Sequence, residues 1–270
     1  MIHALIHRIL LPRMTALEKR TFLPSCIREC TVSVECHSLN SHQDLIKFTS
    51  DSRIPLPLLI HEVIEENSYF PKGIPDFLLE ENSVLIDIGA NIGIFSVFAS
   101  INTNSKIIAI EPHPDNYSLL LCNLELNDIN NIITINSAVG ERHENRFLEI
   151  GQVLSGCQLI PSGHSVPTMK KSIEVDCRTL IEIMQTSNVD LERNPSFIKL
   201  DCEGSEYEIL ESIDNEYLSK IKVISMEYHL KKGEKLMKRL VKRLKYLTFN
   251  IEIRPDKFHP NLGCIYAFQE

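Results

Sequence analysis

One acidic residue and two glycines stand at the end of an apolar segment, in Asp87-Ile88-Gly89-Ala90-Asn91-Ile92-Gly93. Val84 to Ile88 is typical of a buried strand, and a helical pattern begins at Ile92. A tight turn between them lets a ligand lie against the backbone at the carboxyl end of the strand, where open α/β sheets bind cofactors. Glu111 follows the next apolar segment, and a carboxylate there can accept hydrogen bonds from both hydroxyls of a ribose. These residues predict a site for a nucleoside-containing cofactor.

The glycine spacing separates two classes of cofactor. A dinucleotide-binding turn has the pattern G-x-G-x-x-G, whereas this turn has only Gly89 and Gly93 after the leading Asp87. A cofactor without a pyrophosphate does not need the third glycine. The alternative role of the two glycines is to permit close packing of strand and helix. We favour the cofactor because Asp87 ends a buried strand without an evident basic partner in the sequence.

Two further polar clusters follow later apolar segments. Asp201 and Glu203 come after one of them, and side chains two residues apart in an extended segment face the same side. Capping of the next helix, with Ser205 at its start, accounts for Glu206 but not for Asp201 and Glu203 together. His229 follows the next apolar segment and could take a proton from a substrate hydroxyl near neutral pH. A structural hydrogen bond is its alternative role.

The elements that must position these residues alternate between strands and helices from about residue 83 onward. The predicted strands of the main sheet are 84–88, 106–110, 132–136, 197–200, 221–226, 248–253 and 264–268, with helices beginning near 92, 114, 205 and 233. Two short strands, 146–150 and 173–175, flank a long loop from Gly151 to Thr168. The last two strands have no helix between them, which favours an antiparallel hairpin at one edge. We therefore predict an α/β, Rossmann-like fold with a seven-stranded, mostly parallel sheet, an antiparallel last strand and helices on both faces. It resembles the class I S-adenosylmethionine-dependent methyltransferases.

Residues 1–60 differ from the rest because they lack a strong period and contain four prolines. We expect an irregular N-terminal extension there with short elements, and one domain over residues 61–270. Cys26, Cys30, Cys36 and His37 raise the question of a zinc site. Their spacing is not a C-x₂-C pair and no second pair follows, so we expect scattered thiols and no metal.

The composition, with 43% hydrophobic and 24% charged residues, is that of a folded soluble protein. The formal net charge of −8 argues against a nucleic-acid partner. We expect a cytoplasmic protein, since no apolar run is long enough to span a membrane and residues 1–13 lack the continuous apolar core of a signal peptide.

A basic segment, residues 231–245, has eight Lys or Arg and one acid, with apolar residues at helical spacing. It predicts an amphipathic helix with a basic outer face. A solvated face on a helix that packs on the sheet is the favoured interpretation. Peripheral contact with an anionic lipid surface or glycan is the alternative.

Short motifs in a fixed order make the chain similar to the FkbM-type methyltransferases. The resemblance covers about Ile60 to Glu270, and Tyr69 resembles the tyrosine that precedes the first strand in this family. The motifs are residues 86–96, 111–116 with Asn123 and Asn127, 138–140, 198–206 and 227–229.

The resemblance implies S-adenosylmethionine as methyl donor and a hydroxyl acceptor on a sugar, glycolipid or polyketide-like small molecule. By position, the cofactor would be bound by Asp87, Gly89, Asn91, Gly93, Glu111, Asn136, Ser137 and Asp201. Within this set Glu111 would hold the ribose hydroxyls, and Asn136 and Ser137 would lie near the adenine. Asp201, Glu203 and His229 would border the reacting centre, and any of the three could be the general base.

Two other functions stay open at the level of sequence. One is a nicotinamide-dependent oxidoreductase on a related fold, which the missing third glycine disfavours. The other is a module that binds S-adenosylmethionine without turnover. The acceptor and the oligomeric state cannot be inferred from these residues.

Overall fold

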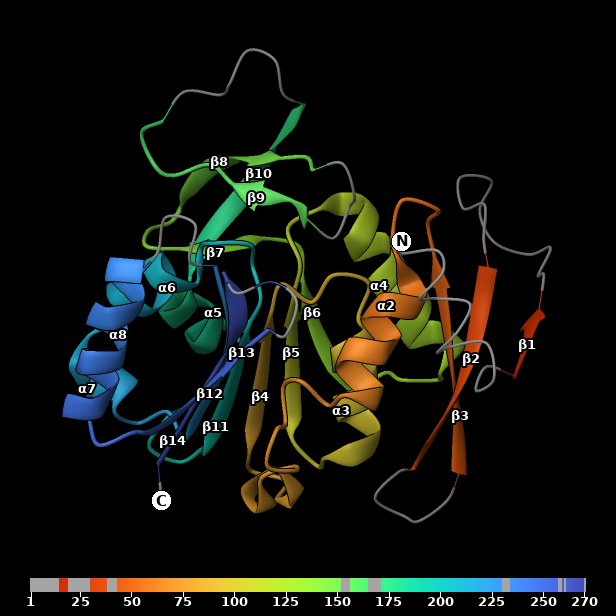
Figure 1. The fold of residues 1–270 in the computed structure, drawn as a ribbon, viewed down its shortest axis with the longest axis horizontal. Coiled ribbons are helices and arrows are strands. Elements are labelled where there is room, and N and C mark those ends of the chain that lie inside the picture. The colour runs from red at the N-terminus through yellow and green to blue at the C-terminus, as the bar shows by residue number, and fades with distance from the viewer. Residues whose placement is uncertain are drawn as a thin grey trace.

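The computed structural model describes residues 15–18, 30–37, 43–151, 156–164, 171–229, 234–256, 259 and 261–269. At its centre is a seven-stranded sheet in the order β13-β14-β12-β11-β4-β5-β6 (Figure 1). The strands are β4 (Val84–Ile88), β5 (Lys106–Ile110), β6 (Ile132–Ile135), β11 (Ser196–Leu200), β12 (Val223–His229), β13 (Asn250–Pro255) and β14 (Leu262–Phe268). The pairs from β12 to β6 are parallel, whereas β14 is antiparallel to both neighbours. The predicted sheet with its reversed last strand is therefore confirmed.

Helices cover both faces of the sheet because successive strand residues point to opposite sides. Leu85, Ile107 and Phe197 are buried in the first layer, and Ile86, Ile108 and Ile198 in the second. The first layer contains α2 (Leu56–Ile60), the π-helix η1 (His61–Glu65), α3 (Ile94–Asn102) and α4 (Pro114–Leu126). The second contains α5 (Leu180–Thr186), α6 (Glu206–Ser212), α7 (Asn215–Leu218) and α8 (Glu234–Tyr246) (Figure 1). A 3-10 turn, η2 (Asp76–Leu79), precedes β4.

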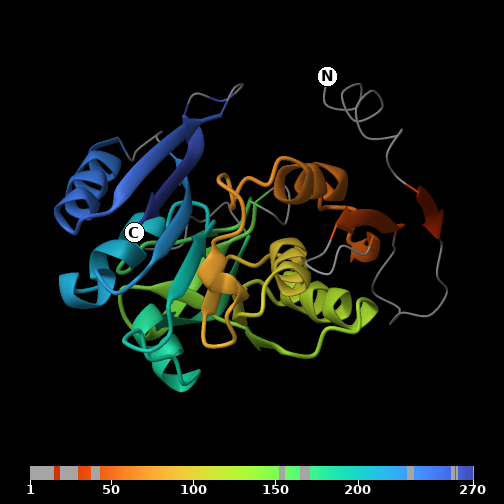
Figure 2. The ribbon, with the colours of Figure 1, turned by 90° about the horizontal axis from the view of Figure 1, so that it is seen from below.

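The N-terminal region contains an antiparallel sheet of β1 (Thr15–Glu18), β2 (Cys30–His37) and β3 (Gln43–Ser50), which lies beside the first helical layer (Figure 2). Strands β2 and β3 are each eight residues long, so this region is more regular than the extension with short elements that we expected. Phe48 is fully buried in the core that α3 and α4 share with the central sheet.

Asn123 of α4 and Asn127, the C-cap residue of this helix, hold β3 against the central domain. The side chain of Asn123 accepts from Thr49 N (2.7 Å) and donates to Thr49 O (3.1 Å), as a neighbouring strand would. Asn127 makes the same pair of bonds with Lys47, at 2.8 Å each. Because unpaired backbone groups are costly when buried, these amides allow the hairpin to end against a helix. The segment that leaves β3 leads directly into α2 and η1.

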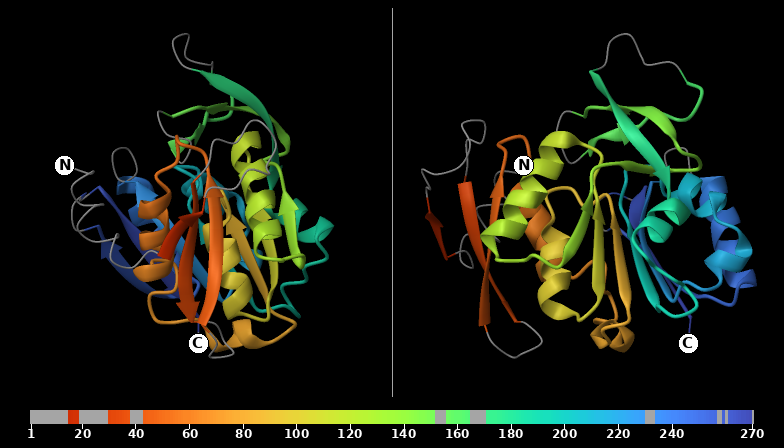
Figure 3. Two further views of the ribbon diagram at one scale, coloured as in Figure 1. Left: turned by 90° about the vertical axis from the view of Figure 1, so that its right-hand side faces the viewer. Right: turned by 180° about the vertical axis from the view of Figure 1, so that it is seen from behind.

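A second sheet stands at the edge of the central sheet where the parallel strands end (Figure 3). Its order is β7-β10-β8-β9, from β7 (Ala138–Gly140), β8 (Glu144–Glu149), β9 (Gln158–Leu159) and β10 (Ser172–Thr179). Sequence analysis predicted only parts of β8 and β10, because β7 and β9 are too short to show a period. The predicted loop from Gly151 to Thr168 thus contains a strand.

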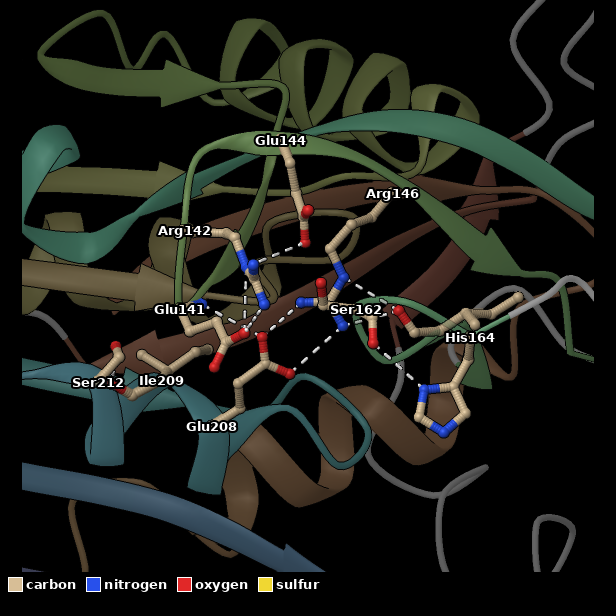
Figure 4. Close-up of polar contacts among 10 residues, drawn as sticks. Glu141, Arg142, Glu144, Arg146, Ser162, His164, Glu208, Ile209 and Ser212 are labelled. Atoms are coloured by element: carbon tan, nitrogen blue, oxygen red, sulfur yellow. Dashed lines mark hydrogen bonds and ion pairs between the residues drawn. The ribbon is translucent and has the colours of Figure 1, made fainter.

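Arg146 of β8 fastens this second sheet to α6 (Figure 4). Its side chain is 4% exposed and donates two hydrogen bonds to the carbonyl oxygen of Ile160, at 3.0 and 2.7 Å. The same guanidinium pairs with the carboxylate of Glu208 on α6. A buried ion pair with this many hydrogen bonds restricts how the two elements can move relative to each other.

The basic helix is confirmed as α8, and part of its charge has structural partners. Arg239 pairs with Glu211 of α6, and Arg243 donates to Leu210 O (2.8 Å) and to the side chain of Asn215 (2.7 Å). These contacts favour the interpretation of α8 as a packed outer helix. Across the described residues, no helix has both the length and the apolar character needed to cross a bilayer.

Candidate functional site

A cavity of about 230 Å³ lies at the carboxyl ends of the central strands, beneath the second sheet. The predicted residues in its wall are Gly89, Asn91, Glu111, Ser137, Asp201 and Glu203. Leu59 and Glu62 contribute from the segment that follows β3, and Glu227 contributes from β12. The second sheet contributes Ala138, Val139, Leu148 and Leu159. The cavity is therefore built from all three parts of the fold.

The glycine turn brings β4 and β11 into close contact. Gly89 has φ +77°, and a Cβ at this position would lie 1.9 Å from the carbonyl oxygen of Asp201. Gly93 also has a positive φ, +86°, and a Cβ there would lie 2.4 Å from a methyl carbon of Leu120. Both positions require glycine for conformation and space. Gly89 faces the cavity, whereas Gly93 begins α3 outside it.

The backbone amides of this turn donate hydrogen bonds to acceptors within the protein. Gly89 N and Ala90 N both donate to Ile110 O, at 3.0 and 2.9 Å, and Gly93 N donates to Ala90 O. Asn91 N donates to the Glu111 carboxylate at 2.9 Å. Pyrophosphate binding at a helix N-terminus depends on free amides of this kind. The turn therefore lacks the donors that a dinucleotide would require here.

Glu111 is held with its carboxyl group in the cavity wall. It is 5% exposed, and its two oxygens accept from Asn91 N and from His113 N (2.8 Å). Burial raises the pKa of Glu111 to about 7, although these hydrogen bonds oppose the shift. The carboxyl retains acceptor capacity for a ligand diol.

Two polar atoms beside Glu111 lack partners. Ser137 Oγ and Asn91 Oδ1 are buried and have no hydrogen-bond partner among the described residues. Both residues line the same cavity. Since buried polar groups are normally paired, these atoms are suited to a polar ligand.

Asp87 and Asn136 do not line the cavity, but each fixes a residue that does. Asp87 is fully buried, accepts from Ser96 Oγ at 2.7 Å and pairs with Lys199 Nζ at 3.0 Å. The sequence showed no evident basic partner for Asp87, and the structure supplies one because Lys199 is its neighbour in β11. Asn136 donates to the backbone oxygen of Glu111 at 2.8 Å.

Asp201 is the centre of a hydrogen-bonded cluster in the cavity wall. Tyr69 Oη donates to Asp201 Oδ2 at 2.7 Å, and Lys199 Nζ lies 3.7 Å from the same oxygen. Burial opposes ionisation of Asp201, but the Lys199 charge and hydrogen bonds from Glu227 and Tyr69 hold its pKa below the ordinary value. Burial and the nearby Asp201 charge raise the pKa of Glu227 far above its ordinary value. Glu227 is thus protonated and donates to an ionised Asp201.

His229 lies beside Glu203 and Glu227, with Nε2 3.4 and 3.7 Å from their carboxylates. It is not among the described residues that line the cavity. The hydrogen bond with Glu203 raises the pKa of His229, while burial opposes the shift. A raised pKa favours the imidazolium, which has no free nitrogen to accept a proton. Of the three predicted residues at the reacting centre, the structure brings Asp201 and Glu203 to the cavity.

Glu203 reaches the cavity by a different route from the predicted one. It has φ +56°, so the segment after Asp201 is a left-handed turn and not an extended strand. The Glu206 carboxylate accepts from Cys202 N (2.8 Å) and Gly204 N (2.9 Å) and closes this turn. Ser205 occupies the N-cap position without a side-chain hydrogen bond.

Glu62 and Glu227 line the cavity but were not predicted as site residues. Glu227 belongs to a quoted motif, and its position two residues before His229 could have indicated it. Glu62 follows α2 in a region without a clear period, so no pattern identified it. Lys199 likewise belongs to a quoted motif, but its pairing depends on strand order.

The described wall of the cavity contains the acids Glu62, Glu111, Asp201, Glu203 and Glu227, and no Lys, Arg or His. Such a wall favours a positively charged ligand. Among the described residues, no three His, Cys, Asp or Glu side chains are placed to hold a metal ion. Cys26 and the side chains of Cys30, Cys36 and His37 lie outside the described part, so the zinc question stays untested.

Comparison with known proteins places this chain in a family. The chain is 24% identical over 236 residues to Methyltransferase 1 of Beauveria bassiana, covering 80% of this chain and 94% of that protein. It is 24% identical over 178 residues to the hexuronic acid methyltransferase AglP of Haloferax volcanii, covering 66% and 69%.

The fold has a counterpart among solved structures. An FkbM methyltransferase from Methylobacillus flagellatus matches with a TM-score of 0.52 and 21% identity, over 75% of this chain. The match covers 47% of that chain, so this protein spans about half of its length. The family model for the methyltransferase FkbM domain matches residues 87–251, from Asp87 at the end of β4 into β13. The chain therefore belongs to the FkbM methyltransferase family.

Proposed function

We propose that this protein is an S-adenosylmethionine-dependent O-methyltransferase that acts on a hydroxyl of a small molecule or glycan. The observation that supports this most directly is the cavity wall, which has five carboxyl groups and no described basic side chain. A sulfonium is a cation and is stabilised by such a wall, whereas the pyrophosphate of a nicotinamide cofactor would be repelled. The backbone amides of the glycine turn already donate to protein acceptors, so they are not free to bind a pyrophosphate. This is a second argument against an oxidoreductase.

The residues around Glu111 fit the nucleoside portion of the cofactor. In this proposal Glu111 accepts from the ribose hydroxyls, and Ser137 and Asn91 supply the unpartnered polar atoms. Gly89 allows close approach to the backbone, and Asp201 faces the sulfonium. Asp87, Gly93 and Asn136 act by holding Lys199, α3 and Glu111 in place.

The strand order separates the two ends of the cofactor. Glu111 follows β5 and Glu227 lies in β12, and the order β5-β4-β11-β12 places three strand spacings, about 14 Å, between them. This length accommodates a nucleoside near Glu111 and a reacting group near Asp201 and Glu227. S-adenosylmethionine supplies a methyl group on a positively charged sulfur, so the protein's task is to orient the acceptor and accept its proton.

The relatives and the cysteines suggest an acceptor and a compartment. One relative is named a hexuronic acid methyltransferase, which makes sugars the first acceptors to test. Among the described residues, free thiols occur at Cys157, Cys177, Cys202 and Cys264, which suits the cytoplasm.

The proposal is tested by incubating the purified protein with methyl-labelled S-adenosylmethionine and a small-molecule extract that contains sugars and glycolipids. We expect a labelled product with a new methyl ether, identified by mass spectrometry. A protein that binds the cofactor but transfers no label to any extract would be a binding module, and the enzymatic proposal would be wrong.

A further inference from the structure

Glu62 lines the cavity, yet no described residue forms a hydrogen bond or ion pair with its carboxyl group. It differs in this from the other acids of the reacting end. Asp201 accepts from Tyr69, Glu227 donates to Asp201, and Glu203 pairs with His229. A carboxyl group without a partner inside a cavity is available to a ligand.

An unusual turn places Glu62 there. The segment η1 is a π-helix, in which Glu66 N donates to His61 O, five residues back, at 2.8 Å. The carbonyl oxygen of Glu62 accepts from Ser68 Oγ at 2.9 Å, which anchors the turn. Leu59 and Glu62 both reach the cavity from this segment. Single π-turns within helices are rare and occur frequently at functional sites.

The charges around Glu62 make it a group that titrates near neutral pH. Burial raises its pKa to about 7, the negative charges of Asp201, Glu66 and Asp256 add to the shift, and Lys199 opposes it. Tyr69, Glu227 and Cys264 also interact electrostatically with it. A general base is most effective when its pKa is close to the working pH.

The other candidates are less suited to remove a proton. Glu203 is paired with His229 Nε2, 3.4 Å away. Glu227 already carries a proton, and His229 has a raised pKa and does not line the cavity. Asp201 has its pKa lowered by Lys199 and by two hydrogen-bond donors, which makes it a weak base.

We propose that Glu62 is the general base for the acceptor hydroxyl, an inference that rests on the proposed methyl transfer to oxygen. The acceptor oxygen forms a bond to the methyl carbon while the carbon–sulfur bond breaks. The electron pair of the broken bond leaves with sulfur as a neutral thioether, and the hydroxyl proton goes to a carboxylate oxygen of Glu62.

The placement of Glu62 is testable without knowing the acceptor. S-adenosylmethionine and S-adenosylhomocysteine share the ribose and adenine but differ by one methyl group and one positive charge. The ratio of their dissociation constants, measured calorimetrically between pH 5.5 and 8.5, therefore cancels the contribution of Glu111. As Glu62 ionises, the affinity for S-adenosylmethionine should rise by about threefold or more relative to the affinity for S-adenosylhomocysteine.

The variant Glu62→Gln should remove this shift, since it keeps the shape and loses the charge. Glu81→Gln is the matched control, because Glu81 is exposed, lies outside the cavity wall and should behave as the wild type. If the ratio of dissociation constants in Glu62→Gln still follows the wild-type pH dependence, the role of Glu62 is wrong while the proposed function stands. Failure of both ligands to bind the wild type would overturn the proposed function and this inference with it.

The rate of methyl transfer provides a second test of the role of Glu62. With the labelled extract product, Glu62→Gln should lower the initial rate by about 100-fold or more, while the affinity for S-adenosylhomocysteine changes less than about twofold. Glu81→Gln should retain the rate. A Glu62→Gln rate within about threefold of the wild type would exclude a base role.

Discussion

At the scale of single residues, the carboxyl groups of the cavity differ in proton state because their neighbours differ. Asp201 is ionised beside Lys199, Glu227 holds a proton against Asp201, and Glu111 titrates close to neutrality. The sequence identified Asp201 and Glu111 as site residues from their places after strands. It could not identify their proton states, which depend on side chains from other strands, as Lys199 shows for Asp87.

The substitution Glu111→Gln tests the ribose contact. An amide offers one acceptor oxygen where the carboxylate offers two charged ones, and losing one charge-assisted hydrogen bond costs about 1.5–3 kcal/mol, or roughly 10–100-fold in affinity for S-adenosylhomocysteine. Titration calorimetry measures the loss, with Glu125→Gln on the exposed surface of α4 as control.

The same residue predicts a pH dependence. Because the pKa of Glu111 is raised to about 7, the carboxyl is protonated below that pH and loses acceptor capacity. Ribose hydroxyls favour the ionised form, so wild-type affinity for S-adenosylhomocysteine should rise with pH through this range and then level off. In Glu111→Gln the rise should be absent; wild-type affinity and pH dependence in this variant would refute the contact.

At the scale of elements, the junction between β3 and α4 decides where the N-terminal region sits. Asn123 is fully buried and also donates to Ile92 O at 2.8 Å, so Asn123→Ala leaves several buried backbone groups without partners. We expect a loss of about 2–4 kcal/mol in the free energy of unfolding, measured by urea denaturation. Asn127→Ala, at a part-buried position, should cost less. A change below about 0.5 kcal/mol for Asn123→Ala would show that the amide does not anchor the strand.

The central strands could be predicted because each buries an apolar run on both faces and ends at a turn. Strands β4 and β5 have the predicted limits, 84–88 and 106–110. The N-terminal hairpin could not be predicted in this way. The backbone groups on one edge of β3 bond to side chains that lie 74 and 80 residues further along the chain. The boundary at residue 60 stays a prediction, although α2 and η1 just beyond β3 contribute to the cavity.

At the scale of the whole molecule, the site needs parts that are distant in the chain. Glu62 comes from the N-terminal side, Asp201 from the central sheet and Leu148 from the second sheet, which Arg146 ties to α6. The charge that sums to −8 is unevenly distributed along the chain, since residues 231–245 form a basic segment. Because Arg239 and Arg243 are engaged with neighbouring helices, contact of α8 with an anionic surface stays a prediction.

The central claim is that the acidic cavity binds S-adenosylmethionine and not a dinucleotide. Calorimetric titration of the purified protein with S-adenosylhomocysteine, S-adenosylmethionine and NAD tests it most directly. We expect saturable binding of the first two at one site per chain and no heat with NAD. Binding of NAD without binding of either adenosyl compound would contradict the account.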